Sequence, residues 1–201
     1  MQKILLASKN RHKLEEIKQI VQIPSVVWVS MDQLSLDIDV VEDGDTFEQN
    51  AVKKAKEIYS ASGIPCVADD SGLEVDALQG EPGVLSARYA GEGATTADNN
   101  RKLIEQLAGK NLSRSTARFH CVAAFFDGEI TKTFVGITEG IVITQPRGEK
   151  GFGYDPLFIP DGYTGTFAEL GEEIKNKISH RAKAFRALAS FLNMYVEMKN
   201  R

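Results

Sequence analysis

Two adjacent carboxylates, Asp69 and Asp70, directly follow the apolar run 65–68 and precede a serine and a glycine. The run predicts a strand, and α/β sheets place their ligands at the carboxyl ends of strands. Carboxylate oxygens there suit a hard cation such as magnesium, which lowers the pKa of a bound water and neutralises phosphoryl oxygens. The same residues would also suit an Asx-type turn, whose carboxylates serve only its own hydrogen bonds. The pattern indicates a cation site, with that turn as the alternative.

A basic turn lies where another apolar run, residues 3–7, meets a helical pattern over residues 11–21. A helix N-terminus offers unpaired N–H groups and the positive end of the helix dipole, both of which attract phosphate. Basic side chains would add charge for a triphosphate, although the segment lacks the glycines of a Walker loop. A helix cap followed by a solvated basic turn is the alternative. The turn consists of Ser8, Lys9, Asn10, Arg11, His12 and Lys13.

An acidic segment, residues 42–44, precedes a helix expected over residues 46–61 and capped by Thr46. A carboxylate beside a helix N-terminus is favoured by the dipole whatever the protein does, so this segment alone indicates little. Lys53 and Lys54 point about 100° apart on that helix, so we expect at most one of them to face a ligand.

Aromatic rings alternate with glycines in the segment GFGYDP, residues 151–156. Glycines let the backbone come close to a planar ligand while a ring lies flat against it, although a packed β-turn explains the same pattern. His180 and Arg181 are adjacent, so they offer donors in two directions rather than a metal pair at helical spacing. A histidine near a helix start is otherwise a cap or a surface residue. The polar residues at this helix start are Glu173, Lys175, Ser179, His180 and Arg181.

The elements that must position these segments are both strands and helices. Helical spacing is also seen over residues 96–107 and in a final helix with Phe185, Leu188, Leu192 and Tyr195 or Val196 on one stripe. Further strands are expected at 26–29, at 117–126 and 129–137 around a two-residue turn, and at 139–144, with a glycine-rich loop over 69–93. This mixture predicts an α/β fold, a long twisted mixed β-sheet flanked by helices, with two lobes and a central active-site cleft. Residues 1–201 are expected to form a single domain.

Composition excludes several classes of protein. With 42% hydrophobic and 26% charged residues the chain resembles ordinary globular proteins, and its net charge of −4 disfavours broad binding to a nucleic-acid backbone. No apolar run approaches the roughly 20 residues that span a bilayer, so we expect no membrane partner. Cys66 and Cys121 each lie in an apolar run, which predicts buried free thiols and a cytoplasmic location.

Taken in order, these segments resemble the inosine triphosphate pyrophosphatase family, also called the dITP/XTP pyrophosphatases. The likeness covers residues 4–188, nearly the whole chain. Each motif alone is weakly specific, but together they are specific. They are EDGDTFEQNAVKKA (42–55), ADDSGLEVDAL (68–78), PGVLSARYAG (82–91), ARFHC (117–121), GFGYDP (151–156) and KISHR (177–181).

The resemblance implies a role for each matching position. Asp70 matches the catalytic acid that accepts a proton and binds magnesium, and Glu42 matches a further acidic residue near the metal, for which Mn²⁺ could substitute. Gln49 departs from the glutamate usual in bacterial relatives and is left out of the site. The implied substrate-binding residues are Ser8, Lys9, Asn10, Arg11, His12, Lys13, Lys54, Ser71, Phe152, Gly153, Tyr154, Asp155, Lys175, His180 and Arg181.

The expected activity is magnesium-dependent hydrolysis of ITP, dITP and XTP to a monophosphate and pyrophosphate, which keeps these nucleotides out of DNA and RNA. The resemblance also implies a homodimer. Two alternatives remain open at this point. One is a Maf-type nucleotide pyrophosphatase, although GFGYDP and ISHR do not suit that family, and the other is a non-catalytic purine nucleotide sensor.

Overall fold

The structure is a computed structural model in which residues 1–199 are described. The chain divides into two compact units. The first unit contains Met1–Asp70, Cys121–Gly136 and the described residues from Arg181 onward, and the second contains Ser71–His120 and Ile137–His180. The expectations of a single domain over residues 1–201 and of a central cleft stay predictions.

A six-stranded mixed sheet confirms the predicted fold class. Its strand order is β2-β1-β3-β4-β5-β6. Strand β1 pairs in parallel with β2 and with β3, whereas β5 and β6 are antiparallel. The strands are β1 (Gln2–Ala7), β2 (Val26–Ser30), β3 (Cys66–Val75), β4 (Arg114–Phe126), β5 (Thr131–Ile143) and β6 (Phe158–Pro160).

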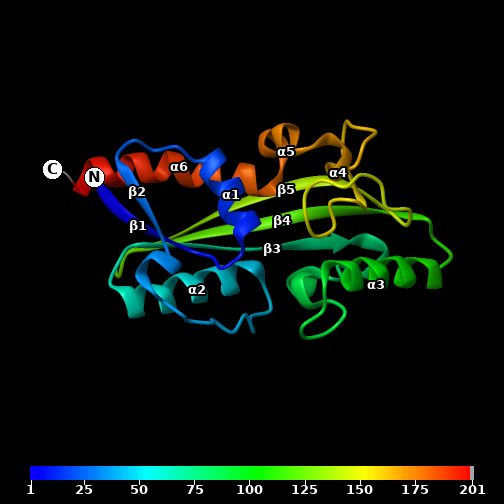
Figure 1. The fold of residues 1–201 in the computed structure, drawn as a ribbon, viewed down its shortest axis with the longest axis horizontal. Coiled ribbons are helices and arrows are strands. Elements are labelled where there is room, and N and C mark those ends of the chain that lie inside the picture. Colours follow the sequence, from blue (N-terminus) through cyan, green and yellow to red (C-terminus); the bar gives the residue numbers. More distant parts are fainter. Residues whose placement is uncertain (200–201) are drawn as a thin grey trace. The chain divides into compact units, whose positions relative to one another are not determined.

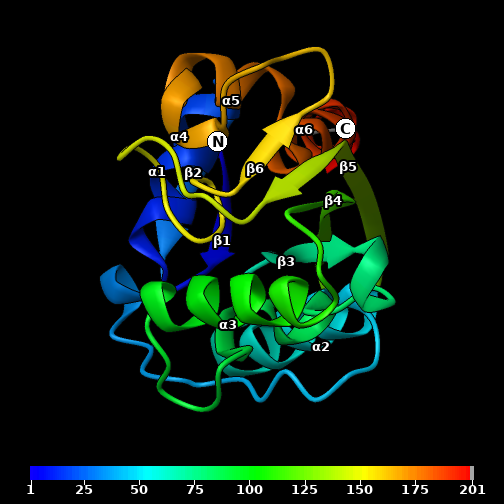
Figure 2. The ribbon, with the colours of Figure 1, turned by 90° about the vertical axis from the view of Figure 1, so that its right-hand side faces the viewer.

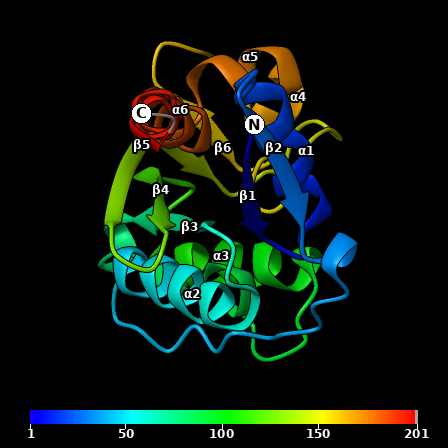
Figure 3. The same cartoon turned by 90° about the vertical axis from the view of Figure 1, so that its left-hand side faces the viewer.

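In the first unit, helices cover both faces of the strands. Helices α1 (Arg11–Ile20) and α6 (His180–Lys199) share an apolar core with one face of β1, and α2 (Phe47–Ser62) lies on the other side (Figures 1 and 3). The expected stripe of α6 is confirmed, because all its members are at most 2% exposed. They are Phe185, Leu188, Leu192, Tyr195 and Val196.

Both predicted ends of α2 are confirmed. The side chain of Thr46 accepts a hydrogen bond from the Gln49 N–H, and the Gln49 side chain accepts one from the Thr46 N–H, which completes a capping box. Gly63 ends the helix with φ +66°, a left-handed conformation that favours glycine. The sequence departure at Gln49 therefore lies in a helix cap.

The second unit has its own core. Helix α3 (Thr96–Gly109) lies on one side of β3, and α5 (Glu172–Ile178) lies on the other side (Figure 2). Leu103 and Leu107 of α3 pack in one cluster with Leu73 and Val75 of β3. The short elements of the chain are η1 (Asp32–Leu34), η2 (Asp76–Leu78), η3 (Gly83–Arg88) and α4 (Phe167–Leu170).

Three local expectations are wrong. Residues 69–75 are not loop, because β3 continues to Val75, and 3-10 helices occupy part of the remaining segment. The turn between β4 and β5 has four residues, because the Asp127 carboxylate accepts hydrogen bonds from the N–H groups of Glu129 and Ile130. The run 139–144 is not a separate strand but lies mostly within β5.

Cys66 and Cys121 are buried free thiols, as predicted, and burial raises the pKa of both. Among residues 1–199, none of the helices combines the length and the apolar character needed to cross a membrane.

Candidate active site

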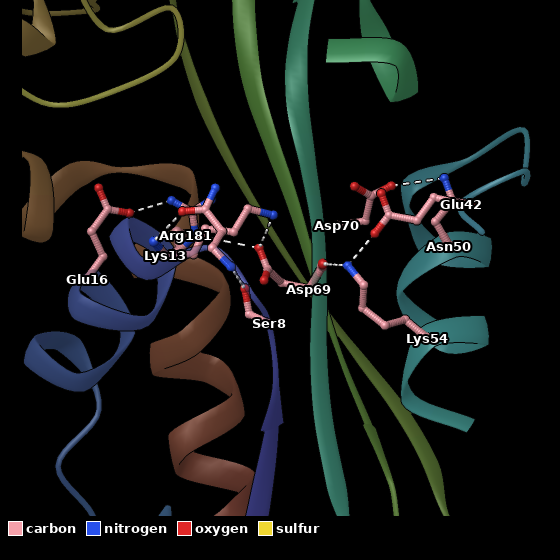
Figure 4. Close-up of polar contacts among 10 residues, drawn as sticks. Ser8, Lys13, Glu16, Glu42, Asn50, Lys54, Asp69, Asp70 and Arg181 are labelled. Atoms are coloured by element: carbon pink, nitrogen blue, oxygen red, sulfur yellow. Dashed lines mark hydrogen bonds and ion pairs between the residues drawn. The ribbon is translucent and has the colours of Figure 1, made fainter. Parts of the chain in front are cut away.

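The centre of the site is the Asp69–Asp70 pair, which lies inside β3 rather than after it. The parallel pairing with β1 ends at Ala7 and Ala68, so the carboxylates lie just beyond the carboxyl end of β1. Because side chains alternate along a strand, Asp69 and Asp70 point in opposite directions (Figure 4). Each carboxylate therefore has its own set of partners.

Asp69 points toward α1 and α6, where it meets positive charge. Its Oδ2 lies 3.1 Å from Lys13 Nζ and 3.6 Å from Arg181 Nε. Burial alone would raise the pKa of Asp69, but Lys13, Arg181 and Lys54 outweigh it and lower that pKa to about 2. Asp69 is therefore a stably ionised group whose charge is already matched by cations.

Asp70 points toward α2 and has the opposite electrostatics. Its Oδ2 accepts a hydrogen bond from Asn50 Nδ2 at 3.0 Å, which orients the carboxylate (Figure 4). Burial, together with the negative charge of Glu42, raises the pKa of Asp70 to about 6, against the opposing influence of Lys13, Asn50 and Lys54. Two carboxylates that disfavour each other's charge in a buried place are suited to sharing a cation.

Lys54 contacts both Glu42, the carboxylate near Asp70, and the backbone of Asp69. Its ammonium pairs with Glu42 and donates a hydrogen bond to the backbone carbonyl oxygen of Asp69 at 3.2 Å. Lys53 points elsewhere and pairs with Asp43 at 2.5 Å. The expectation that at most one of these lysines faces the site is met by Lys54.

Not every residue of the basic turn, residues 8–13, lies against the Asp69–Asp70 pair. Asn10 caps α1 by accepting a hydrogen bond from the Lys13 N–H, and Ser8 Oγ accepts one from the Asn10 N–H. Lys9 pairs with Asp37 at 2.9 Å and with Asp39 at 3.6 Å. Exposed side chains are found at Arg11 and His12.

Arg181 is part of a buried ion-pair network in the first unit. Arg181 is 1% exposed, and its guanidinium pairs with Glu16 of α1 as well as with Asp69 (Figure 4). Burial opposes the charged form, but Asp69 and Glu16 raise the pKa of Arg181 above its usual value. The observed contacts thus give Arg181 a role in holding α1, α6 and β3 together.

Replacing Arg181 with alanine should lower the free energy of unfolding by about 3 kcal/mol or more, because it leaves the Asp69 and Glu16 charges buried without this partner. Urea denaturation measures the loss. Arg186→Ala, an exposed arginine on the same helix, is the matched control. If the free energy of unfolding is unchanged and the ratio of kcat/KM for ITP to kcat/KM for ATP falls, Arg181 instead contacts the base.

The aromatic segment and its neighbours form a second group, within the second unit. The Asp155 carboxylate accepts a hydrogen bond from the Phe152 N–H at 2.8 Å and pairs with the Lys175 ammonium at 2.6 Å. That ammonium also lies 4.2 Å from the centre of the Phe152 ring. A Cβ on Gly151 would lie 2.2 Å from Asp155 Oδ2, so only glycine fits there. The motif is therefore a tightly closed turn around one buried ion pair.

The remaining residues of that group are partly structural. Tyr154 is buried and donates its hydroxyl hydrogen bond to the Ser86 carbonyl oxygen at 2.9 Å. The His180 ring stacks on Phe119 with centroids 4.7 Å apart and planes 11° apart, which fixes the plane of the imidazole. Ser71 follows Asp70 in β3 and is half-buried.

The sequence assigns no role in the first site to two of its polar residues, although Asn50 lies on the same predicted helix as Lys53 and Lys54. Asn50 is 1% exposed and four residues before Lys54, so both lie on one face of α2. Glu16 is 9% exposed and three residues after Lys13 on α1. Helical spacing from a predicted site lysine is the feature of the sequence that could have identified both.

Comparison with known proteins decides the family. The model of the Ham1 family matches residues 4–191 of this chain. The chain belongs to the Ham1 family.

Two curated relatives match nearly the whole length of this Ham1 chain. It is 46% identical to the dITP/XTP pyrophosphatase of Porphyromonas gingivalis, over 96% of this chain and 98% of that relative. It is 42% identical to the dITP/XTP pyrophosphatase of Bacillus subtilis, over 96% of this chain and 98% of that relative.

A solved structure of a Ham1 protein from Coxiella burnetii superposes with a TM-score of 0.89 at 38% identity, covering 96% of this chain and 100% of that one. The structure of the Staphylococcus aureus Ham1 protein gives a TM-score of 0.86 at 40% identity, with the same coverage. The resemblance inferred from the motifs is therefore confirmed at the level of family and of fold.

Proposed function

We propose that this protein hydrolyses the non-canonical purine nucleoside triphosphates ITP, dITP and XTP to the monophosphate and pyrophosphate. The observation that carries the proposal is the arrangement of Asp70, Glu42 and Asn50 beside Lys54 and Lys13. It combines carboxylates that suit a cation with lysines that suit phosphate, in a chain whose relatives are named dITP/XTP pyrophosphatases. The consequence for the cell is removal of these nucleotides before polymerases can use them.

The reaction consumes one water for each bond that is broken. A water oxygen forms a bond to the α-phosphorus, the bond to the bridging oxygen breaks, and pyrophosphate leaves with the electron pair of that bond. Asp70 orients the water and accepts its proton, because Asn50 holds the carboxylate and burial makes it a better base than an exposed aspartate. Lys13 and Lys54 stabilise the negative charge that accumulates on the leaving group.

The residues present fit a magnesium ion. Among residues 1–199, no three His, Cys, Asp or Glu side chains are grouped as an all-protein metal site requires. Magnesium instead is usually held by one or two carboxylates and by substrate phosphates, and Asp70 and Glu42 supply the two carboxylates. When bound, the ion would neutralise phosphoryl oxygens and acidify water. Asp69 suits this role less, because Lys13 and Arg181 both lie against it and hold its pKa at about 2. Burial and Glu42, in contrast, disfavour the charge of Asp70 unless a cation is present.

The purine base is assigned to the second group of residues. Phe152 offers a ring face, Gly153 and Tyr154 shape the turn, and Lys175 and His180 provide donors. Ser8, Asn10 and Ser71 are assigned to the phosphate and sugar side, together with Lys9, Arg11 and His12 of the basic turn. Asp155 holds Lys175 and Phe152 in place.

Two alternative functions are a Maf-type nucleotide pyrophosphatase and a non-catalytic nucleotide sensor. Membership of the Ham1 family does not favour a Maf-type enzyme. A non-catalytic sensor would bind the same nucleotides with the same residues, but relatives named dITP/XTP pyrophosphatases do not favour one, and a turnover measurement separates the two directly. We also propose that the protein works in the cytoplasm and as a homodimer; size-exclusion chromatography with light scattering tests the dimer, and cell fractionation tests the location.

The decisive experiment measures pyrophosphate released from dITP by the purified protein in the presence of Mg²⁺. Stoichiometric formation of dIMP and pyrophosphate supports the proposal. Tight binding of dITP without turnover would make the protein a sensor, and release of orthophosphate would contradict cleavage at the α-phosphorus.

ATP should be a poor substrate, with a kcat/KM at least roughly 100-fold below that for ITP. Hypoxanthine and xanthine carry a carbonyl at position 6, which accepts hydrogen bonds from donors such as Lys175, whereas adenine carries an amino group there. Steady-state kinetics with ITP, XTP, GTP and ATP test this. Equal kcat/KM values for ITP and ATP would remove the base-reading role from Lys175 and His180.

A further inference from the structure

A polar side chain outside the family motifs attaches the aromatic turn to a helix. Asn100, in the second turn of α3, donates a hydrogen bond from Nδ2 to the carbonyl oxygen of Gly153 at 3.1 Å. Both residues belong to the second unit, although they lie 53 positions apart in the chain. The direction of the amide is set by this bond, because only its NH₂ group can donate to a carbonyl.

The carbonyl that Asn100 holds is at the centre of the turn. On one side of Gly153, the Phe152 N–H donates to Asp155 Oδ2, and on the other the Asp155 N–H donates to the Phe152 carbonyl at 3.2 Å. Lys175 is tied to the same turn through the Asp155 carboxylate and lies over the Phe152 ring. These bonds fix the internal shape of the turn, and the bond from Asn100 fixes its place against α3.

Asn99, the neighbouring asparagine, makes hydrogen bonds to a different segment. Asn99 Oδ1 accepts a hydrogen bond from the Ala90 N–H at 2.8 Å, and Asn99 Nδ2 donates to the Ala87 carbonyl at 3.0 Å. Asn99 is buried, whereas Asn100 is half-buried. Replacing the amide nitrogen of Asn100 with oxygen therefore leaves the packing of α3 in place. It alters mainly the contact between Asn100 and the turn.

We propose that Asn100 is a positioning residue for nucleobase recognition. This proposal rests on the proposed function. By holding the Gly153 carbonyl it sets where Phe152 and Lys175 stand when the base arrives. Interactions with the base are made equally in the bound substrate and in the transition state, because the reacting bond is at the α-phosphorus. Loss of correct positioning therefore weakens binding and leaves the chemical step unchanged.

The test compares Asn100→Asp and Asn100→Leu with the unaltered protein. Aspartate keeps the shape but places an anionic oxygen against the Gly153 carbonyl, and leucine removes the donor. Asn100→Asp should raise the KM for dITP roughly 5- to 10-fold, as expected for one lost hydrogen bond, with kcat unchanged within about twofold. Because Asn100 Oδ1 is buried without a hydrogen-bond partner, the carboxylate should lower the melting temperature, whereas Asn100→Leu, which adds no charge, should keep it close to that of the unaltered protein.

Two controls make the result specific. Gln106→Glu makes the same amide-to-acid change at an exposed position of α3 and should leave KM unchanged. Inhibition by inorganic pyrophosphate, which occupies only the phosphate side, should have the same inhibition constant in Asn100→Asp as in the unaltered protein.

Three outcomes decide the matter. An unchanged KM for dITP in both Asn100 variants overturns the positioning role, as does a fall in kcat accompanied by a lower melting temperature in Asn100→Leu. If the unaltered protein releases no pyrophosphate from dITP, the proposed function fails separately. Calorimetric binding of ITP to the same variants then tests Asn100, and only a weaker affinity in Asn100→Asp supports it.

Discussion

Asp70→Asn should fold as well as the unaltered protein and lose roughly three orders of magnitude in kcat. The position is buried, and burial together with Glu42 raises the pKa of the Asp70 carboxyl, so its negative charge is unfavourable in the folded protein without a cation. An uncharged amide of the same shape removes that penalty but can neither hold magnesium nor accept a proton. A gain or no change in stability combined with a large loss of turnover is the pattern expected of a functional charge.

Pyrophosphate release and urea denaturation measure the two effects side by side. Asp45→Asn provides the control, since Asp45 is an exposed carboxylate beside the cap of α2. It should retain full kcat. Near-normal turnover in a folded Asp70→Asn protein would remove Asp70 from the reaction, and a large loss of stability would mean that the charge serves the fold.

Removal of divalent cations should abolish activity completely and reversibly. The two carboxylates assigned to the ion, Asp70 and Glu42, offer only oxygen ligands, which suit hard cations. We expect no detectable pyrophosphate after dialysis against a chelator, and full recovery on adding Mg²⁺ or Mn²⁺. Thermal unfolding of the dialysed protein shows whether the fold persists, which it should, because the core clusters involve apolar side chains.

A second arm of that experiment uses Glu42→Gln. If Glu42 shares the ion with Asp70, this variant should need a higher concentration of Mg²⁺ for half-maximal activity. Activity that survives exhaustive chelation would contradict the metal assignment while leaving the assignment of the lysines to phosphate intact.

Much of the fold could be predicted from periodicity alone. The capped helix at Thr46, the α6 stripe and the strand β1 followed by α1 all follow from local patterns, and the structure confirms them. The end of β3 could not be predicted, because adjacent aspartates and a glycine are typical of a turn. In the folded chain Asp69 is instead neutralised by Lys13 and Arg181, which are distant in sequence. Long-range charge pairing of this kind has no local pattern.

The sequence motifs likewise predict only part of the site, because long-range pairing leaves no local pattern. They identified Asp70, Glu42 and Lys54 as members, and the structure brings these together. They could not show that Lys9 pairs with Asp37 and Asp39, since partners across a loop depend on the path of the backbone.

The pairing of Arg181 with Glu16 and Asp69 also determines when the site at β3 can form during translation. Arg181 follows Glu16 by 165 residues, and a ribosome adds residues from the N-terminus onward. Until α6 has emerged, the nascent chain holds β1, α1 and the aspartates of β3 without the guanidinium that links them. The site at β3 is therefore completed only after α6 has been synthesised, whatever has already folded before that.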